Sequence, residues 1–172
     1  MCCFTFLKSF SSRHLLGFLA LTCAAILGAA YVLKHVYGVQ PCPMCLYEQD
    51  VFMAGGALSL LGFLIFPPTL RRWTLLLLGF VFFGGTLLAA YHVAIQQHWV
   101  SLPAFCAAQD FSAFDSVDAL RDQLLNTPFV RCDQVTWSLF GFSLAAYNAL
   151  ISFVLMLLCW KWVCVNRSAS CK

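Results

Sequence analysis

Four long apolar segments divide the sequence and limit the folds that are open to it. Three of them, at 15–33, 73–91 and 137–160, run for 19, 19 and 24 residues without a charge, and 51–66 adds another 16. About 20 apolar residues are enough for a helix to cross a bilayer. The shortest segment reaches that length if its helix starts near Pro43. With 62% of 172 residues hydrophobic, a soluble core could not bury so much apolar surface.

We therefore expect an all-α membrane protein, a four-helix transmembrane bundle that forms a single domain over residues 1–172. The spans are expected at about 15–35, 44–66, 73–94 and 137–163, with loops at about 36–43 and 95–136 and a tight turn at 69–72. The first segment is longer than the apolar core of a typical signal peptide, and further spans follow it, so we interpret it as a retained helix.

The basic residues predict how the bundle is oriented. Four spans place both termini on one side, which holds seven of the Lys and Arg residues, whereas the side of the two loops holds three. The positive-inside rule then puts both termini in the cytoplasm and the loops outside. The lipid bilayer is thus a partner of the chain, and we expect no nucleic-acid partner.

The outer side is expected to carry four of the ten cysteines: Cys42, Cys45, Cys106 and Cys132. An oxidising compartment favours their pairing, and four cysteines allow three pairings. The natural partition is Cys42–Cys45 and Cys106–Cys132, with exchange between the pairs left open. The first pair would close a loop of two residues, which constrains little of the unfolded chain and favours a redox role over a structural one. The second is also plausible as a structural staple.

Cys42 and Cys45 flank the predicted start of the second span. Pro43 suits the first helical position, so Cys42 would be the N-cap and Cys45 the third helical residue. Unpaired N–H groups and the helix dipole favour a thiolate there, and the thiolate is the reactive form. Haem attachment would need histidine at position 46, which is Leu46. A zinc site would need a second close cysteine pair, so we expect no metal.

The long loop contains a predicted amphipathic helix at 110–126. Apolar residues recur there at spacings of three and four, and charged residues occupy the other face. Such a helix would either lie on the membrane surface or pack on a small core of the loop itself. Either arrangement keeps the loop near the membrane and able to carry a disulfide to a partner.

Three sequence features together resemble the disulfide bond formation protein B (DsbB) family of bacterial quinone-linked thiol oxidases. The first is Cys42-x-x-Cys45 followed by Leu-Tyr-Glu, and the second is a long loop with two cysteines. The third is Cys132, then Trp137 after four residues, then Gly-Phe-Ser at 141–143. The resemblance covers nearly the whole chain.

The resemblance implies an enzyme of the bacterial inner membrane that reoxidises a periplasmic DsbA-like dithiol protein and reduces a membrane quinone, ubiquinone or menaquinone. The catalytic residues would be Cys42, Cys45, Cys106 and Cys132, with disulfides Cys42–Cys45 and Cys106–Cys132. The partner would attack Cys106, and the released Cys132 would pair with Cys42. Cys45 would then face the quinone as a thiolate.

Gln49 and His92 are the other quinone-binding candidates that the resemblance implies. The family usually has arginine where this chain has Gln49, which offers hydrogen bonds but no charge. Two alternatives remain open. One is a membrane scaffold whose four outer cysteines form static structural disulfides. The other is an electron conduit that reduces periplasmic disulfides, because cysteine spacing does not fix the direction of electron flow.

Overall fold

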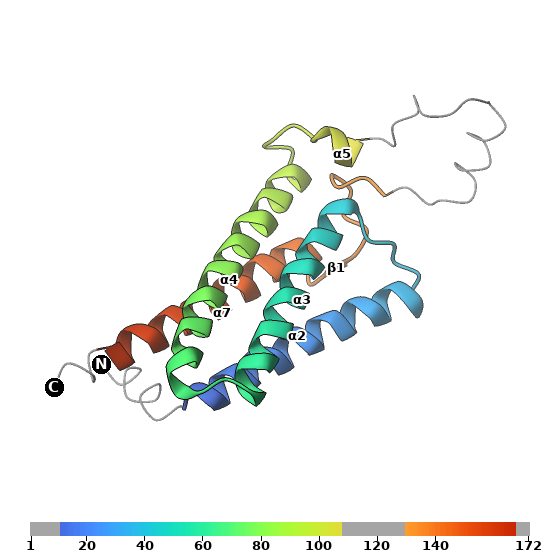
Figure 1. The fold of residues 1–172 in the computed structure, drawn as a ribbon. Helices are drawn as coiled ribbons and strands as arrows, with labels where there is room; N and C mark the ends of the chain where they lie inside the picture. The colour runs from blue at the N-terminus through green and yellow to red at the C-terminus, as the bar shows by residue number, and fades with distance from the viewer. Residues whose placement is uncertain (1–10, 108–129, 168–172) are drawn as a thin grey trace, which may run out of the picture.

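The structure is a computed structural model that describes residues 11–107 and 130–167. Long helices pack side by side in this part of the chain, with a short helix and a two-stranded hairpin at one end (Figure 1). The predicted amphipathic helix at 110–126 lies outside the described residues. The elements are α2 (Ser12–His35), α3 (Pro43–Leu64), α4 (Pro68–Gln96), α5 (Ala104–Ala107), β1 (Ser138–Leu139), β2 (Phe142–Ser143) and α7 (Leu144–Arg167).

The elements define two ends of the bundle. The start of α2, the α3–α4 connection and the end of α7 lie at one end (Figure 1). The α2–α3 connection, α5 and the β1–β2 hairpin lie at the other end. The four outer cysteines of the sequence analysis belong to this second end, which we call the cysteine end.

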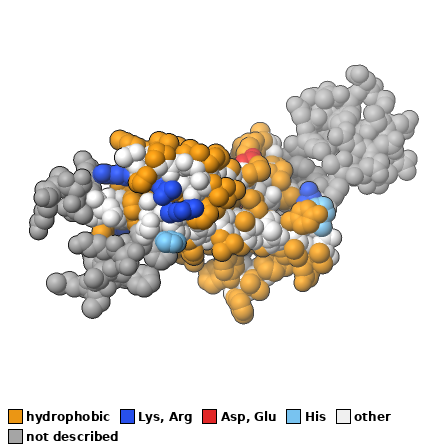
Figure 2. All heavy atoms as spheres, turned by 60° about the horizontal axis from the view of Figure 1, so that its bottom comes forward, with side chains coloured by type: hydrophobic (Ala, Val, Ile, Leu, Met, Phe, Trp, Pro, Cys, Tyr) orange, Lys and Arg blue, Asp and Glu red, His pale blue; other side chains and the backbone are white. Residues whose placement is uncertain are grey.

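Three described helices are long and apolar enough to cross a membrane: α2, α4 and residues 144–166 of α7. Helix α3, with 22 residues, is long enough as well, but it carries Glu48, Gln49 and Asp50 in its first turns. Large apolar side chains cover much of the visible surface, and Lys and Arg gather mainly toward the α3–α4 end (Figure 2). This distribution is that of a membrane protein with several spans.

Helix α4 starts earlier than the sequence analysis predicts. The predicted turn at 69–72 is wrong, because these residues form the first turn of α4, with Pro67 as N-cap and Pro68 at the first helical position. Proline has the right φ for that position and lacks only an N–H that would stay unpaired. Arg71 also donates to the carbonyl of Gly62 at 3.2 Å, which ties the new helix to the end of α3.

Helix α7 starts later than predicted. The expected start at position 137 is wrong, because residues 138–143 form the β1–β2 hairpin and the helix begins at Leu144. Phe140 and Gly141 make the turn with φ of 50° and 83°. Ser143 then caps α7 by accepting a hydrogen bond from the Ala146 N–H at 3.3 Å. Residues 137–143 carry no charge, so an apolar segment defined by the absence of charge includes this hairpin and helix cap.

Close approach of the helices depends on glycines at their contacts. The Trp160 side chain of α7 occupies the space where Gly79 of α4 has no side chain. In the same way, Gly56 of α3 faces the side chain of Cys23 from α2, and Gly55 faces the ring of Phe82 from α4. Small residues at helix contacts are typical of membrane bundles. The apolar core formed between these helices consists of Leu15, Leu16, Leu19, Cys23, Phe52, Leu75, Leu78, Phe82, Leu155, Met156, Cys159, Trp162 and Val163.

Candidate redox site

The first turn of α3 positions two of the predicted cysteines. Cys42 is the N-cap, Pro43 occupies the first helical position, and the Cys45 N–H donates to Cys42 Sγ at 3.3 Å. The predicted helix start is confirmed. The sequence analysis predicts that the helix N–H groups stabilise a thiolate at Cys45. This part of the prediction is wrong, because the N–H of Cys45 instead bonds to the sulfur of Cys42, the N-cap residue. The side chain of an N-cap residue accepts a hydrogen bond from the N–H of the second or third helical residue, which here is Cys45.

The two thiols lie in contact at the cysteine end. Their sulfur atoms are 2.9 Å apart, and both residues are free cysteines in this structure rather than the expected disulfide. Cys42 is buried, and Cys45 is partly exposed. The Cys45 thiol and then His92 stabilise negative charge on Cys42 and lower its pKa to about 5, although burial opposes the shift. These contacts favour the thiolate form at Cys42 over Cys45.

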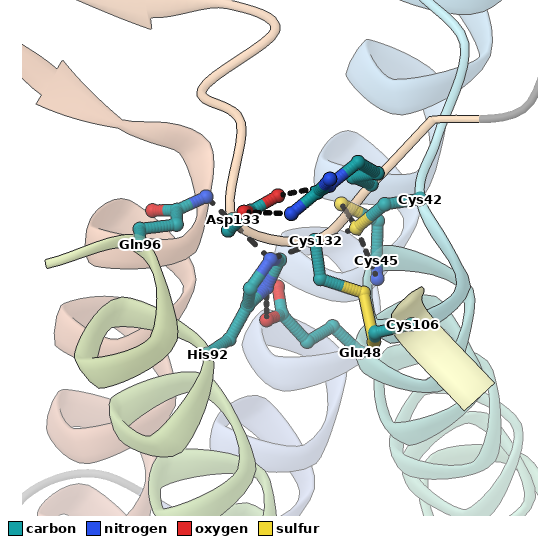
Figure 3. The surroundings of a disulfide bond; sticks show 9 residues. Cys42, Cys45, Glu48, His92, Gln96, Cys106, Cys132 and Asp133 are labelled. Carbon is teal, nitrogen blue, oxygen red and sulfur yellow. Dashed lines mark hydrogen bonds and ion pairs between the residues drawn. A yellow bond between two sulfur atoms is a disulfide. The ribbon is translucent and has the colours of Figure 1, made fainter. Parts of the chain in front are cut away.

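A buried polar network extends from Cys42 through three helices. His92 of α4 lies with Nε2 3.6 Å from Cys42 Sγ and Nδ1 2.7 Å from Glu48 Oε1 on α3 (Figure 3). The other carboxylate oxygen of Glu48 accepts a hydrogen bond from Asn148 of α7. Glu48 and His92 are 2% and 1% exposed. The sequence analysis did not identify Asn148, although an amide within an apolar span was a signal for it.

Cys106 and Cys132 form a disulfide next to the thiol pair (Figure 3). Cys106 lies on α5, and the ring of its neighbour Phe105 packs edge-on against Tyr47 of α3. Cys132 lies in a turn that a bidentate ion pair between Arg131 and Asp133 holds, with distances of 3.0 and 2.7 Å.

Both disulfide cysteines are 0% exposed. They belong to one buried group, the sulfur-rich cluster, which consists of Cys42, Met44, Ile95, Cys106 and Cys132. The structure thus brings the four predicted cysteines to one place, although they come from separate loops.

A cavity of about 380 Å³ lies on the other side of Cys45. Residues of α2, α3 and α7 line it, and most of its wall is apolar. Cys45 and Gln49 contribute from α3, Lys34 and His35 from α2, and Asn148 from α7. An apolar cavity of this size with a few polar groups is typical of a small-molecule site. Gln49 therefore lies where the sequence analysis places a cofactor, whereas His92 does not line this cavity and faces Cys42.

A metal ion fits this arrangement less well. Ligand atoms of Cys42, Cys45 and His92 lie within 4.8 Å of one another. Two sulfurs of a tetrahedral zinc site, however, are roughly 3.8 Å apart, given zinc–sulfur bonds of about 2.3 Å. The 2.9 Å contact between Cys42 and Cys45 is shorter than that and favours sulfur–sulfur chemistry.

The chain is similar to known disulfide bond formation proteins over most of its length. The family model "Disulfide bond formation protein DsbB" matches residues 12–162. Disulfide bond formation protein B of Marinobacter nauticus is 32% identical over 91% of this chain and 94% of its own length. Disulfide bond formation protein B 1 of Pseudomonas aeruginosa is 34% identical over 84% of this chain and 89% of its own. The chain therefore belongs to the DsbB family of disulfide bond formation proteins and is a multi-pass membrane protein.

Proposed function

We propose that this protein oxidises a DsbA-like dithiol protein in the periplasm and passes the electrons to a membrane quinone. The observation that carries the proposal is the position of the Cys42–Cys45 pair between two different surroundings. Cys42 packs in the cluster that contains the loop disulfide, whereas Cys45 lines the apolar cavity. One short helix turn thus joins a protein disulfide to a space suited to a lipid-soluble molecule.

The residues of the cavity fit a quinone. Apolar wall residues of α2 and α7 would hold the ring and tail, and Gln49 and Lys34 would offer hydrogen-bond donors to its oxygens. A quinone bound there would supply a two-electron acceptor beside Cys45. The balanced reaction is that a dithiol and a quinone give a disulfide and a quinol, so two electrons and two protons are transferred.

The order of thiol exchange follows from the two cysteine pairs. A thiolate of the partner would attack Cys106 and release Cys132. Cys132 would then exchange with the oxidised Cys42–Cys45 pair at Cys42, because both residues belong to the sulfur-rich cluster. This exchange leaves Cys45 free on the cavity side. The second thiol of the partner then displaces Cys106 and leaves as a disulfide, and Cys106 re-forms its bond with Cys132, which releases Cys42 and leaves the Cys42–Cys45 pair reduced. Since Cys106 and Cys132 are 0% exposed, the partner must displace part of this cluster before it reaches the disulfide.

The topology completes the proposal. We place α3 in the membrane as a fourth span, with the cysteine end in the periplasm and both termini in the cytoplasm of a bacterial inner membrane. The distribution of basic residues supports this orientation. Thiol labelling of intact cells after reduction would then reach the four outer cysteines. Labelling of Cys2, Cys3 or Cys171 in preference to these four would reverse the topology and contradict the mechanism.

The purified protein provides the direct test of the reaction. It is mixed with a reduced DsbA-like protein and a quinone, and quinone absorbance is followed over time. We expect one quinol for each substrate disulfide formed, with ubiquinone and menaquinone analogues compared as acceptors. A scaffold would consume no quinone, and a reducing conduit would instead consume added quinol and reduce the substrate disulfide. Either result would contradict the proposed function.

A further inference from the structure

Glu48 is held by a separate helix at each of its two carboxylate oxygens. His92 of α4 bonds to Oε1 at 2.7 Å, and Asn148 of α7 donates to Oε2. A buried carboxylate is costly unless its lone pairs are satisfied, and here both oxygens have partners. Replacement of such a buried pair by apolar residues is often neutral or stabilising. Stability of the bundle alone therefore does not account for a fully bonded Glu48 next to a thiol.

The same contacts fix the orientation of the imidazole of His92. An ionised carboxylate only accepts hydrogen bonds, so Nδ1 carries the hydrogen of the Nδ1–Oε1 contact. In the neutral ring Nε2 is then the acceptor, and it lies 3.6 Å from Cys42 Sγ. The amide of Gln96 lies 3.5 Å from the same Nε2, while its Oε1 is buried without a partner among the described residues. A rotation of that amide would present Oε1 to a protonated Nε2.

We propose that His92 accepts the proton of Cys42, and that Glu48, held by Asn148, is the positioning residue that directs Nε2 at the sulfur. This inference rests on the proposed function and adds a role that the family resemblance does not contain. Oxidation of Cys42 and Cys45 to a disulfide releases two electrons and two protons. The electrons go to the quinone, the Cys42 proton goes to Nε2 of His92, and the Cys45 proton follows the electrons.

The charges around Cys42 agree with this assignment. The thiolate accepts from the Cys45 thiol and the Cys45 N–H, and an imidazolium at His92 faces it from α4. Together these contacts bring the pKa of Cys42 to about 5. Among the described residues, the other charged groups around Cys42 are Glu48 on α3, behind the imidazole, Lys34 and His35 of α2, which line the cavity on the Cys45 side, and the Arg131–Asp133 ion pair beside Cys132. Within the described part of the chain, His92 is the basic side chain that contacts Cys42 Sγ and can hold its proton.

The test measures Cys42 alone, in reduced protein without quinone and without a partner. Iodoacetamide modification is followed from pH 4 to pH 10, and fragmentation mass spectrometry separates Cys42 from Cys45. In the native chain we expect a midpoint near the pKa of about 5. His92→Gln should move it part of the way toward the ordinary thiol value of about 8.5, because the contacts from Cys45 remain, and modification at pH 6.5 should slow at least about tenfold. Glu48→Gln should slow it at least about tenfold, because the imidazolium loses its counter-charge.

Asp50→Asn is the matched control, since it removes the same charge two residues along α3 from an exposed side chain. Its midpoint should equal that of the native chain. Asn148→Leu should give a smaller shift than Glu48→Gln, because the carboxylate stays but loses one donor. Thermal melts in detergent show whether each variant is folded, and Glu48→Asp, which keeps the charge, should retain a low midpoint.

Two results would overturn the inference. One is a native midpoint near that of an ordinary thiol. The other is folded His92→Gln and Glu48→Gln variants whose midpoints equal that of Asp50→Asn, which would assign Glu48 and His92 to packing. Because this assay contains no quinone, its result is independent of the quinone assay. A low midpoint that depends on His92, with no quinone consumption, would contradict the proposed function and leave the proton assignment standing.

Discussion

The structure buries two groups of cysteines in very different surroundings. Cys23 and Cys159 lie in the apolar core and are both 0% exposed. Cys42, Cys106 and Cys132 lie in the sulfur-rich cluster and are 0–4% exposed, so burial does not distinguish the groups. Their neighbours do distinguish them. Cys23 contacts glycine and apolar side chains, whereas Cys42 contacts an imidazole, a second thiol and a helix N–H.

The difference shows how one set of helices provides both an inert and a reactive environment for sulfur. Helix α3 contributes Phe52, from its middle, to the apolar core, whereas Met44 and the N-cap Cys42 lie at its N-terminal end in the sulfur-rich cluster. Only the N-terminal end of α3 offers unpaired N–H groups, and the network of Glu48, His92 and Asn148 gathers at the same end. Reactivity at cysteine therefore follows from position along the helix.

Substitution within each group should give the largest contrast. Cys45→Ser should lower quinone-linked oxidation roughly a thousandfold or more, because a hydroxyl cannot form the disulfide that the cycle requires. The double variant Cys23→Ala with Cys159→Ala should keep its turnover within about twofold and lose about 1 kcal/mol of stability for each buried sulfur removed. Quinone absorbance and thermal melting measure the two effects. A loss of turnover in the double variant would contradict the contrast between the groups.

Removal of the loop disulfide should distinguish the roles of the two cysteine pairs. The double variant Cys106→Ser with Cys132→Ser should slow oxidation of a protein dithiol at least about a hundredfold, because the disulfide that the partner attacks is absent. A small dithiol such as dithiothreitol can still reduce the Cys42–Cys45 pair, so its oxidation should fall only a few-fold. The two substrates are compared with one protein preparation. Equal losses with both substrates would show that the two pairs do not act in sequence.

A change in the apolar core should affect stability alone. In Gly79→Ala the added methyl group would overlap the Trp160 indole, which should cost about 1–3 kcal/mol. In Gly84→Ala, on the same helix, the methyl group would meet nothing within 4 Å, so stability should stay equal or rise by up to about 1 kcal/mol. Thermal melts in detergent measure both. At temperatures well below the melt, a change in the Cys42 midpoint in Gly79→Ala would show that the two regions are coupled.

The sequence predicts much of this arrangement because some local signals are strong. Pro43 after Cys42 fixes the start of α3, and long uncharged segments predict the apolar helices. The start of α7 was missed because absence of charge does not distinguish a hairpin from a helix, whereas Gly141 and Ser143 do. The polar network could not be predicted in this way. His92 lies 44 residues from Glu48 along the chain and Asn148 lies 100 residues from it, so only the packing of the helices brings the three together.

The weakest expected effect concerns the cavity side of Cys45. Gln49→Arg would add a second cation to a cavity wall that already contains Lys34. It should lower the quinone KM about three- to tenfold, which corresponds to about 1 kcal/mol of binding free energy. Lys34→Gln should raise the KM by a similar factor. Leu46→Arg places the same charge on α3 outside the cavity lining and should leave the KM unchanged. If all three variants have the same quinone KM as the native chain, charge in this cavity does not control binding of the acceptor. The electrostatic contribution to the reaction would then be confined to the contacts of Cys42 at the N-terminal end of α3.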